Sequence, residues 1–407
     1  MIKRVFGNTF EPLAVPAFLA LWIGTILSNI GTMIQSVGAA WLMTTLTTSP
    51  AMVALVQTAS TLPFMLLSLP VGAAADLYDR RIIMICAQSV VVAAATVCAV
   101  LAFVNGLTPW TLLALTFVVG AGAVLHAPTW QASFGDIVPR TMLPSAVALN
   151  SLSYNTARSI GPALGGAVAA ILGASATFLL NALATLPLLI ILLRWKGAPR
   201  NTDVPTEPLL NAVWIGIRHA GSSRPILNAM AHGAGMAFSG GAMWALLPLI
   251  AKEQLQGGPG LFGVLLGAIG VGALTGASFS GAVRQRLRSD QLWTGSALTL
   301  AIASIVMGLS TNVWLTAAAL IVAGAAWLLG LSTLISLVQL SAPRWVAGRV
   351  LSMYQLTTFG SLAVGSAAWG ALADHLALSV TLCIAGLAAL MAALFFRLNP
   401  LPDIPPQ

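Results

Sequence analysis

The sequence predicts an all-α membrane protein with twelve transmembrane helices, arranged as two pseudo-symmetric bundles of six. Three observations support this fold class: the composition, a series of long apolar runs and an internal repeat. Of the 407 residues, 58% are hydrophobic and 7% are charged, whereas a soluble protein carries about 25% charged residues. Because so few charges cannot cover a surface exposed to water, the chain is expected to lie mainly in lipid.

Twelve apolar stretches follow one another along the chain. Each is long enough to cross about 30 Å of hydrocarbon as a helix that rises about 1.5 Å per residue. The connections on one side are short, as at 44–50, 105–109 and 311–312, so no extracellular domain is expected. The expected spans are 15–43, 51–75, 82–104, 110–134, 145–172, 174–195, 225–251, 260–283, 291–310, 313–339, 348–373 and 378–396.

An internal repeat divides the chain into two related units. The tripeptide VPR at 138–140 matches APR at 342–344, and the same offset aligns Gly161 with Gly365 and Gly166 with Gly370. Six crossings return the chain to its starting side, so both units have the same orientation, an arrangement that places substrate sites between halves near the bilayer midplane. The expected parts are an N-terminal bundle (1–196), a linker with a short amphipathic helix (197–224) and a C-terminal bundle (225–407).

The basic residues indicate an orientation. The net charge is +8, but these residues recur in ones to threes between apolar runs and form no aromatic-interleaved patch, so nucleic acid is not an expected partner. If the N-terminus is cytoplasmic, sixteen of the eighteen Lys and Arg residues fall in cytoplasmic segments, and Lys252 and Arg158 are the exceptions. The positive-inside rule therefore predicts that both termini are cytoplasmic.

The connection between the second and third spans carries a recognisable motif. Residues 72–81 read GAAADLYDRR. This segment resembles the signature loop of the major facilitator superfamily, G-x-x-x-D-R-x-G-R-K, with Leu77 replacing its first Arg and Asp79 replacing its second Gly.

This resemblance implies a gate on the cytoplasmic side. Asp76 would lie near the positive end of the eleventh helix, and Arg80 would pair with Asp136 at the end of the fourth. The alternative is that these are plain loop charges that obey the positive-inside rule. The implied gating residues are Gly72, Asp76, Arg80, Arg81 and Asp136.

The fifth span contains a second motif. Gly161, Pro162, Gly165 and Gly166 match the G-P-x-x-G-G core of the antiporter motif found in exporters of the same superfamily, although Ala157 stands where an upstream Gly is usual. The proline frees a backbone carbonyl and the glycines allow a neighbouring helix to approach closely. Generic packing by small residues is the alternative interpretation.

Further segments make the chain similar to one branch of the superfamily, that of the enterobactin exporter and the macrolide efflux proteins. The resemblance implies a multi-pass, monomeric transporter of the bacterial inner membrane that exports amphiphilic drug-like compounds or a siderophore in exchange for protons, with lipid around it and with no cofactor or metal. These segments are Trp41, 49–50, 79–81, 128–131, 148–151, 157–158, 245–248 and 348–351.

Arg158 is the principal candidate for substrate binding. It lies near the middle of the fifth span, where an unpaired charge costs at least ~3 kcal/mol, so it is expected to face a partner or the space between the halves. It either attracts an anionic substrate or serves a structural role, bonded to helix carbonyls or Asn side chains. Asn29 lies at a similar depth. The other expected binding residues are Gln35, His126, Trp130, Asn155, Asn228, His232, Trp327, Tyr354 and Gln355.

No acid falls in the middle of a span, so proton coupling has no evident carrier. His126 and His232 titrate near neutral pH in principle, and packed, hydrogen-bonded histidines are the alternative. An enzyme is excluded, because the sequence has no H-E-x-x-H helix and no paired intramembrane aspartates. A passive channel is disfavoured, since no filter-like segment is present. A nutrient or metabolite importer and a lysophospholipid flippase remain as alternatives on the same scaffold.

Overall fold

The computed structural model describes residues 10–197, 218, 220–343, 346–398 and 400–401, with side chains left out at 69 and 72–77. These residues form helices and no strand. The N-terminal half contains six long helices, α2 (Pro16–Leu46), α3 (Pro50–Leu77), α4 (Arg80–Phe103), α5 (Pro109–Ala132), α7 (Leu143–Leu172) and α8 (Ala174–Arg194). Short helices lie between or before them: η1 (Glu11–Ala14), α6 (Phe134–Ile137) and η2 (Arg140–Met142).

The C-terminal half repeats this plan. Its long helices are α10 (Arg224–Leu249), α11 (Pro259–Arg286), α12 (Ser289–Leu309), α13 (Val313–Ser341), α14 (Ala347–His375) and α15 (Leu378–Phe396), and a single π-helical turn, η3 (Ile250–Gln254), extends α10. The core of the amphipathic helix expected in the linker lies outside the described residues.

Eleven of the long helices are long and apolar enough to cross a membrane. The exception is α7, which was expected to be the fifth span. Its 30 residues are ample in length, but it carries Arg158 together with Asn, Ser and Thr side chains, which lower its hydropathy. The crossing by α7, and with it the count of twelve, stays a prediction.

Local sequence sets where many of these helices begin. Prolines occupy the first turns of α2, α5 and α11, where the missing N–H costs nothing. Polar side chains cap other starts: Asn312 accepts bonds from the backbone of Trp314 and Leu315, and Asp79 accepts one from Arg81. The apolar runs are therefore divided into helices at the expected places.

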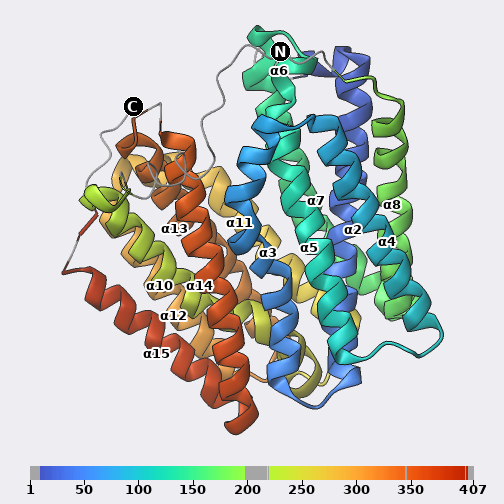
Figure 1. The fold of residues 1–407 in the computed structure, drawn as a ribbon. Helices are drawn as coiled ribbons and strands as arrows, with labels where there is room; N and C mark the ends of the chain where they lie inside the picture. The colour runs from blue at the N-terminus through green and yellow to red at the C-terminus, as the bar shows by residue number, and fades with distance from the viewer. Residues whose placement is uncertain (1–9, 198–217, 219, 344–345, 399, 402–407) are drawn as a thin grey trace, which may run out of the picture.

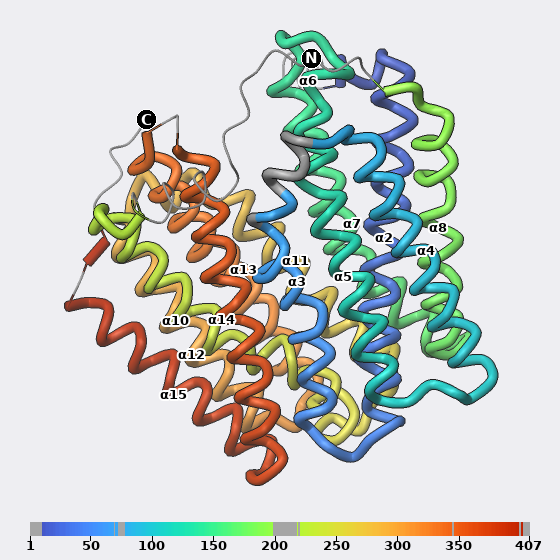
Figure 2. Tube along the Cα trace, in the orientation of Figure 1, coloured from blue at the N-terminus to red at the C-terminus, as the bar shows by residue number. Residues whose placement is uncertain are grey.

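The helix pairing shows a twofold relationship between the halves. In the N-terminal half α2 packs on α7, α3 on α5, and α4 on both α5 and α8. The same pairs recur in the C-terminal half as α10 with α14, α11 with α13, and α12 with both α13 and α15. Between the halves, α3 packs along α14 and α7 along α11, two contacts that exchange under the same relationship (Figure 1). The tube in Figure 2 shows the two bundles side by side.

Small and polar residues hold the N-terminal half together. Gly24, Gly31 and Gly38 recur every seven residues on α2, and each faces a residue of α8, a close approach that favours helix association in lipid. Asn181 of α8 donates to the Oε1 atom of Gln35 at 2.6 Å. Gln35, expected at the substrate site, is therefore buried in the packing of its own half.

Candidate functional site

The candidate site lies where the two halves meet. We call the end of the bundle at which α6 lies the proximal end and the opposite end the distal end (Figure 1). On α7 and α11, backbone meets backbone: a Cβ added to Gly166 would lie 2.6 Å from the Cα atom of Gly263, and one added to Gly270 would lie 3.0 Å from the Cα atom of Ser159. These contacts run from the middle of α7 to its distal end.

The pair α3 and α14 is joined over the same depth. The rings of Phe64 and Phe359 stack with centroids 5.0 Å apart, and the Thr58 hydroxyl donates to the Ala363 carbonyl at 3.0 Å. At the distal end, a carboxylate of the C-terminal half caps the first turn of α3 in the N-terminal half.

This distal cap is built on Asp374 at the end of α14. Its Oδ1 atom accepts the backbone N–H of Ala51 at 3.0 Å and its carboxylate accepts the Ser49 hydroxyl at 3.0 and 3.1 Å. Lys252 adds another link between the halves, because its ammonium group donates to the Thr44 carbonyl. The sequence shows an acid at a helix end and a Ser-Pro pair at a helix start, but 325 residues separate them, so neither was expected to meet the other.

The proximal parts of the same helices are exposed. On α11 the exposed fraction of Phe279 is 65% and Ser278 is exposed, and on α7 Ser151 and Asn155 are exposed. The close contacts described above join the halves from the middle of α3 and α7 to the distal end.

The glycine motif in α7 places this helix between two neighbours. Gly161 and Gly165 face α2, where added Cβ atoms would lie 2.5 Å from the Cβ atom of Met33 and 3.0 Å from the Cα atom of Ile34. Gly166 faces α11, and the Pro162 carbonyl would lie 2.8 Å from a Cβ on Gly263. The motif thus serves both the packing of its own half and the contact with the other half.

Arg158 lies one turn before this motif and reaches across to the C-terminal half. Its guanidinium carbon lies 5.5 Å from the centroid of the Trp244 ring on α10, a cation–π distance. Trp244 in turn packs edge to face on Trp327 of α13, with centroids 6.1 Å apart. The structure therefore brings two expected residues, Arg158 and Trp327, together through Trp244. Sequence reasoning missed Trp244, because a tryptophan in an apolar span carries no sign of the side it faces.

Asn29 lies at the same level on α2, next to Ile30, whose carbonyl is 3.6 Å from the Cβ position of Gly161. Asn29 therefore lies at about the depth of Arg158, on the neighbouring helix α2. Its role in binding stays a prediction.

Trp130 packs inside its own half. It is 2% exposed, stacks on Phe18 and meets Phe134 edge to face, and its indole N–H donates to Asn150 at 3.0 Å. Trp130 was expected at the binding site because of its aromatic character. It is instead a core residue of the N-terminal half and does not face the other half.

His232 and Tyr354 are likewise buried within the C-terminal half. The His232 ring lies 4.4 Å from both Trp293 and Phe396, and its Nδ1 atom is 2.7 Å from the Asn228 carbonyl.

The remaining expected binding residues are scattered. Asn228 lines a hollow at the proximal end of α10. Asn155 and Gln355 are exposed, and Asn155 donates to the Ser151 carbonyl of its own helix at 2.8 Å. His126 is buried, and within the described part of the chain neither of its ring nitrogens has a hydrogen-bond partner.

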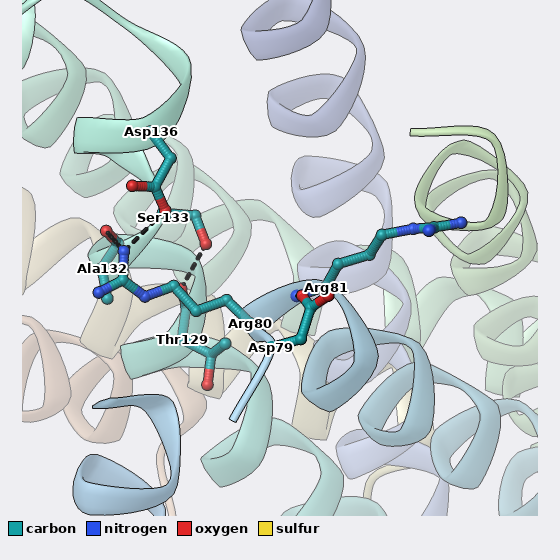
Figure 3. Close-up of polar contacts among 7 residues, drawn as sticks. All are labelled: Asp79, Arg80, Arg81, Thr129, Ala132, Ser133 and Asp136. Atoms are coloured by element: carbon teal, nitrogen blue, oxygen red, sulfur yellow. Dashed lines mark hydrogen bonds and ion pairs between the residues drawn. The ribbon is translucent and has the colours of Figure 1, made fainter. Parts of the chain in front are cut away.

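A charge cluster lies at the proximal end of the N-terminal half (Figure 3). The Nη1 atom of Arg80 lies 2.7 Å from Asp136 Oδ2 and donates to the Ala132 carbonyl at 2.8 Å. Both side chains of this ion pair are about one third exposed, at 31% and 38%. The ion pair implied by the signature loop is thus present, although Asp136 lies on the short helix α6 and not on the fourth span itself.

The neighbouring residues of the loop have separate partners. Arg81 points away from this pair (Figure 3) and donates to the carbonyls of Leu192 and Leu193 at the end of α8. Asp79 caps α4. Gly72 and Asp76 lie in the segment whose side chains the structure does not describe. Across the described residues no three His, Cys, Asp or Glu side chains gather as metal ligands.

Comparison with known proteins places this architecture in a family. Residues 7–406 match the transmembrane secretion effector family. The staphyloferrin A transporter of Staphylococcus aureus is 24% identical over 279 residues, which cover 67% of this chain and 65% of that protein. Macrolide efflux protein A of Streptococcus pyogenes is 27% identical over 141 residues, which cover 34% and 35%. The matched segments thus span less than two thirds of these two relatives.

A longer match is the multidrug efflux pump Tap of Mycolicibacterium fortuitum, which is 24% identical over 405 residues, covering 93% of this chain and 95% of that protein. Among solved structures, a bacterial homologue of the human lysosomal transporter Spinster superposes with a TM-score of 0.76 at 16% identity, over 95% of this chain and 97% of that one. A D-xylose-proton symporter has a TM-score of 0.72 at 15% identity, over 96% and 98%. These family members and structural neighbours are transporters and not enzymes. The chain is a multi-pass membrane transporter that belongs to the transmembrane secretion effector family of the major facilitator superfamily.

Proposed function

We propose that the chain is a monomeric secondary active exporter of the inner membrane that works by alternating access. The observation that carries this proposal is the location of the contacts between the halves. Backbone contacts on α7 and α11 and the cap on α3 join the halves from the middle to the distal end, while polar residues on the proximal parts of α7 and α11, such as Ser151, Asn155 and Ser278, are exposed. A transporter in this state takes up cargo from the proximal side and releases it after the halves rock to the opposite state.

The distribution of basic residues supports a cytoplasmic proximal side. Apart from Arg158, the described arginines lie at the proximal ends of helices, as at Arg194, Arg224 and Arg397, whereas Lys252 lies at the distal end and links the two halves there. Under the positive-inside rule the open side of this structure faces the cytoplasm, which is the loading state of an exporter.

We infer that the cargo is an amphiphilic drug-like compound or a siderophore and that protons drive its export. The names of the relatives support this cargo, since they include a staphyloferrin A transporter, a macrolide efflux protein and a multidrug efflux pump. A nutrient importer and a lysophospholipid flippase are the alternatives. Uptake of a labelled sugar or amino acid into proteoliposomes favours the importer, and movement of lysophospholipid between leaflets favours the flippase.

The proximal charge cluster supplies a gate in this proposal. When the proximal side closes, the end of α3 approaches the start of α14, where Asp76 would meet the positive end of the helix. The Arg80–Asp136 pair fixes the start of α4 against α6, and so holds the short connection that follows Asp76 at the end of α3.

Expression of the chain in a strain stripped of efflux pumps should lower the intracellular accumulation of at least one compound from a panel of amphiphilic drugs and siderophores. An uncoupler should abolish this difference, because the proton gradient is the proposed driving force. Accumulation of radiolabelled compounds is the measurement. Unchanged accumulation for the entire panel, or export that survives the uncoupler, contradicts the proposal.

Cross-linking the halves at their distal contact should stop export. A Cβ on Gly267 lies 3.7 Å from the Cβ atom of Ala163, within the range of a disulfide, so Ala163→Cys with Gly267→Cys should cross-link α7 to α11 in a background without Cys86, Cys98 and Cys383. Export of the cargo found in the panel should fall to background on oxidation and recover on reduction.

The matched control for this cross-link is Gly235→Cys with Ala392→Cys, a pair with the same 3.7 Å separation but within the C-terminal half, where the Phe396 ring edge must shift to admit the new side chain. This pair should cross-link without loss of export. Export that continues when α7 and α11 are cross-linked would rule out alternating access.

Reversal of either charge in the proximal pair should slow export, and reversal of both should restore it. A partly exposed ion pair contributes up to about 1 kcal/mol, so Arg80→Asp or Asp136→Arg alone should reduce the export rate about fivefold. The double variant is compared with the single ones at equal protein level. Arg140→Asp, at an exposed arginine of η2, serves as the control. A double variant no better than the single ones argues against a gating role for this pair.

A further inference from the structure

The contact between Arg158 and Trp244 joins the two halves near the middle of α7. Arg158 is the sixteenth of the 30 residues of α7, and the rings of Trp244 and Trp327 come from α10 and α13 of the other half. Building on the proposed function, we propose that Arg158 and Trp244, with Trp327 packed behind, bind an anionic amphiphile, whose acidic group pairs with the Arg158 guanidinium and whose apolar body lies against the Trp244 ring.

The balance of charge at this depth favours an anion. The acids of the described side chains lie at helix ends or in connections, as do Asp136 on α6, Glu253 in η3 and Asp374 at the end of α14. Within the described residues Arg158 therefore has no carboxylate partner, and its contact is the face of Trp244. Because an unpaired charge inside a membrane protein is costly, a bound anion would stabilise the site and a bound cation would be repelled.

The hydrogen-bonding groups of the site favour an acceptor. Arg158 presents N–H donors and no acceptor. The indole N–H of Trp244 is buried, and among the described residues it has no hydrogen-bond partner. Both of these groups are donors, and a ligand rich in acceptor oxygens, such as a carboxylate or sulfonate, complements them.

The rings of the site favour an apolar body next to the acid. Trp244 and Trp327 meet at an interplanar angle of 67°, and Trp327 fits against Gly240, where a larger residue would meet the ring. The half-buried ring of Trp244 offers a flat apolar surface beside the guanidinium, and the buried ring of Trp327, 6% exposed, supports it from within the C-terminal half. Since Arg158 belongs to one half and Trp244 to the other, the affinity for a ligand that contacts both depends on the relative position of the halves.

Binding of two probes with the same ring and opposite charge tests this inference. Purified protein in phosphatidylcholine nanodiscs is titrated with naphthoate and with naphthylmethylammonium by calorimetry. The wild type should bind naphthoate at least about tenfold more tightly, because a charge-assisted pair with Arg158 contributes that much or more.

Variants assign the preference to Arg158 and Trp244. Arg158→Gln should remove the preference for naphthoate, and Arg158→Lys should retain part of it. Trp244→Phe keeps a ring but lacks the N–H and should weaken naphthoate binding several-fold. Arg284→Gln is the control, since Arg284 is a cation of α11 that donates to Ser332 and Ser336 on α13, and it should leave the preference unchanged. Melting temperatures of all variants show whether each is folded.

Equal affinity for the two probes, or tighter binding of the cation, would overturn the inference. So would an Arg158→Gln variant that is folded and still prefers naphthoate. Loss of naphthoate binding in nanodiscs that contain phosphatidylglycerol would indicate that an anionic lipid headgroup occupies the site. This result would also contradict the proposal that the site binds a water-soluble cargo. Because binding is measured without transport, a failure here leaves the cross-linking result on alternating access intact, and a failure of cross-linking to stop export leaves the binding result intact.

Discussion

Gly166 of α7 and Gly263 of α11 bring the backbones of the two halves into direct contact, and much of the structure depends on this approach. A Cβ on either residue would lie 2.6 Å from the Cα atom of the other, so larger side chains would push the helices apart. In lipid no hydrophobic effect drives helices together, and close packing with interhelical hydrogen bonds must hold them. The glycine contact and the Asp374 cap at α3 together join the distal ends of the halves.

The same contact explains where charge is tolerated. Gly166 holds α7 against α11. Arg158 lies two turns from Gly166 toward the proximal end and reaches Trp244 of the opposite half. Acids stay at helix ends, where backbone N–H groups, hydroxyls or arginines meet them, as at Asp374 and in the Arg80–Asp136 pair. The middle of the bundle thus holds a cation against an aromatic ring, which suits a site that attracts a ligand and later releases it.

Much of the fold was predictable, because long apolar runs indicate membrane-spanning helices and the internal repeat indicates two related halves. The positions of the long helices follow from apolar runs that start at prolines or capping residues. For α7 the repeat was the better guide, since its polar side chains lower its hydropathy. The site was only partly predictable: Arg158 stood out by its cost in lipid, whereas Trp130 and Trp244 look alike in sequence, and only packing shows that the first lies in a core and the second between halves.

Distances between spin labels on opposite ends of the halves test alternating access most directly. One pair, at the exposed residues Ser151 of α7 and Ser278 of α11, reports on the proximal side, and another, at the exposed residues Thr48 and His375, reports on the distal side. Pulsed electron resonance in nanodiscs should show that the proximal distance shortens as the distal distance lengthens when cargo is added, and that Asp374→Asn shifts the population in the same direction. Two distances that change together, or that both stay fixed while cargo binds, would contradict this account.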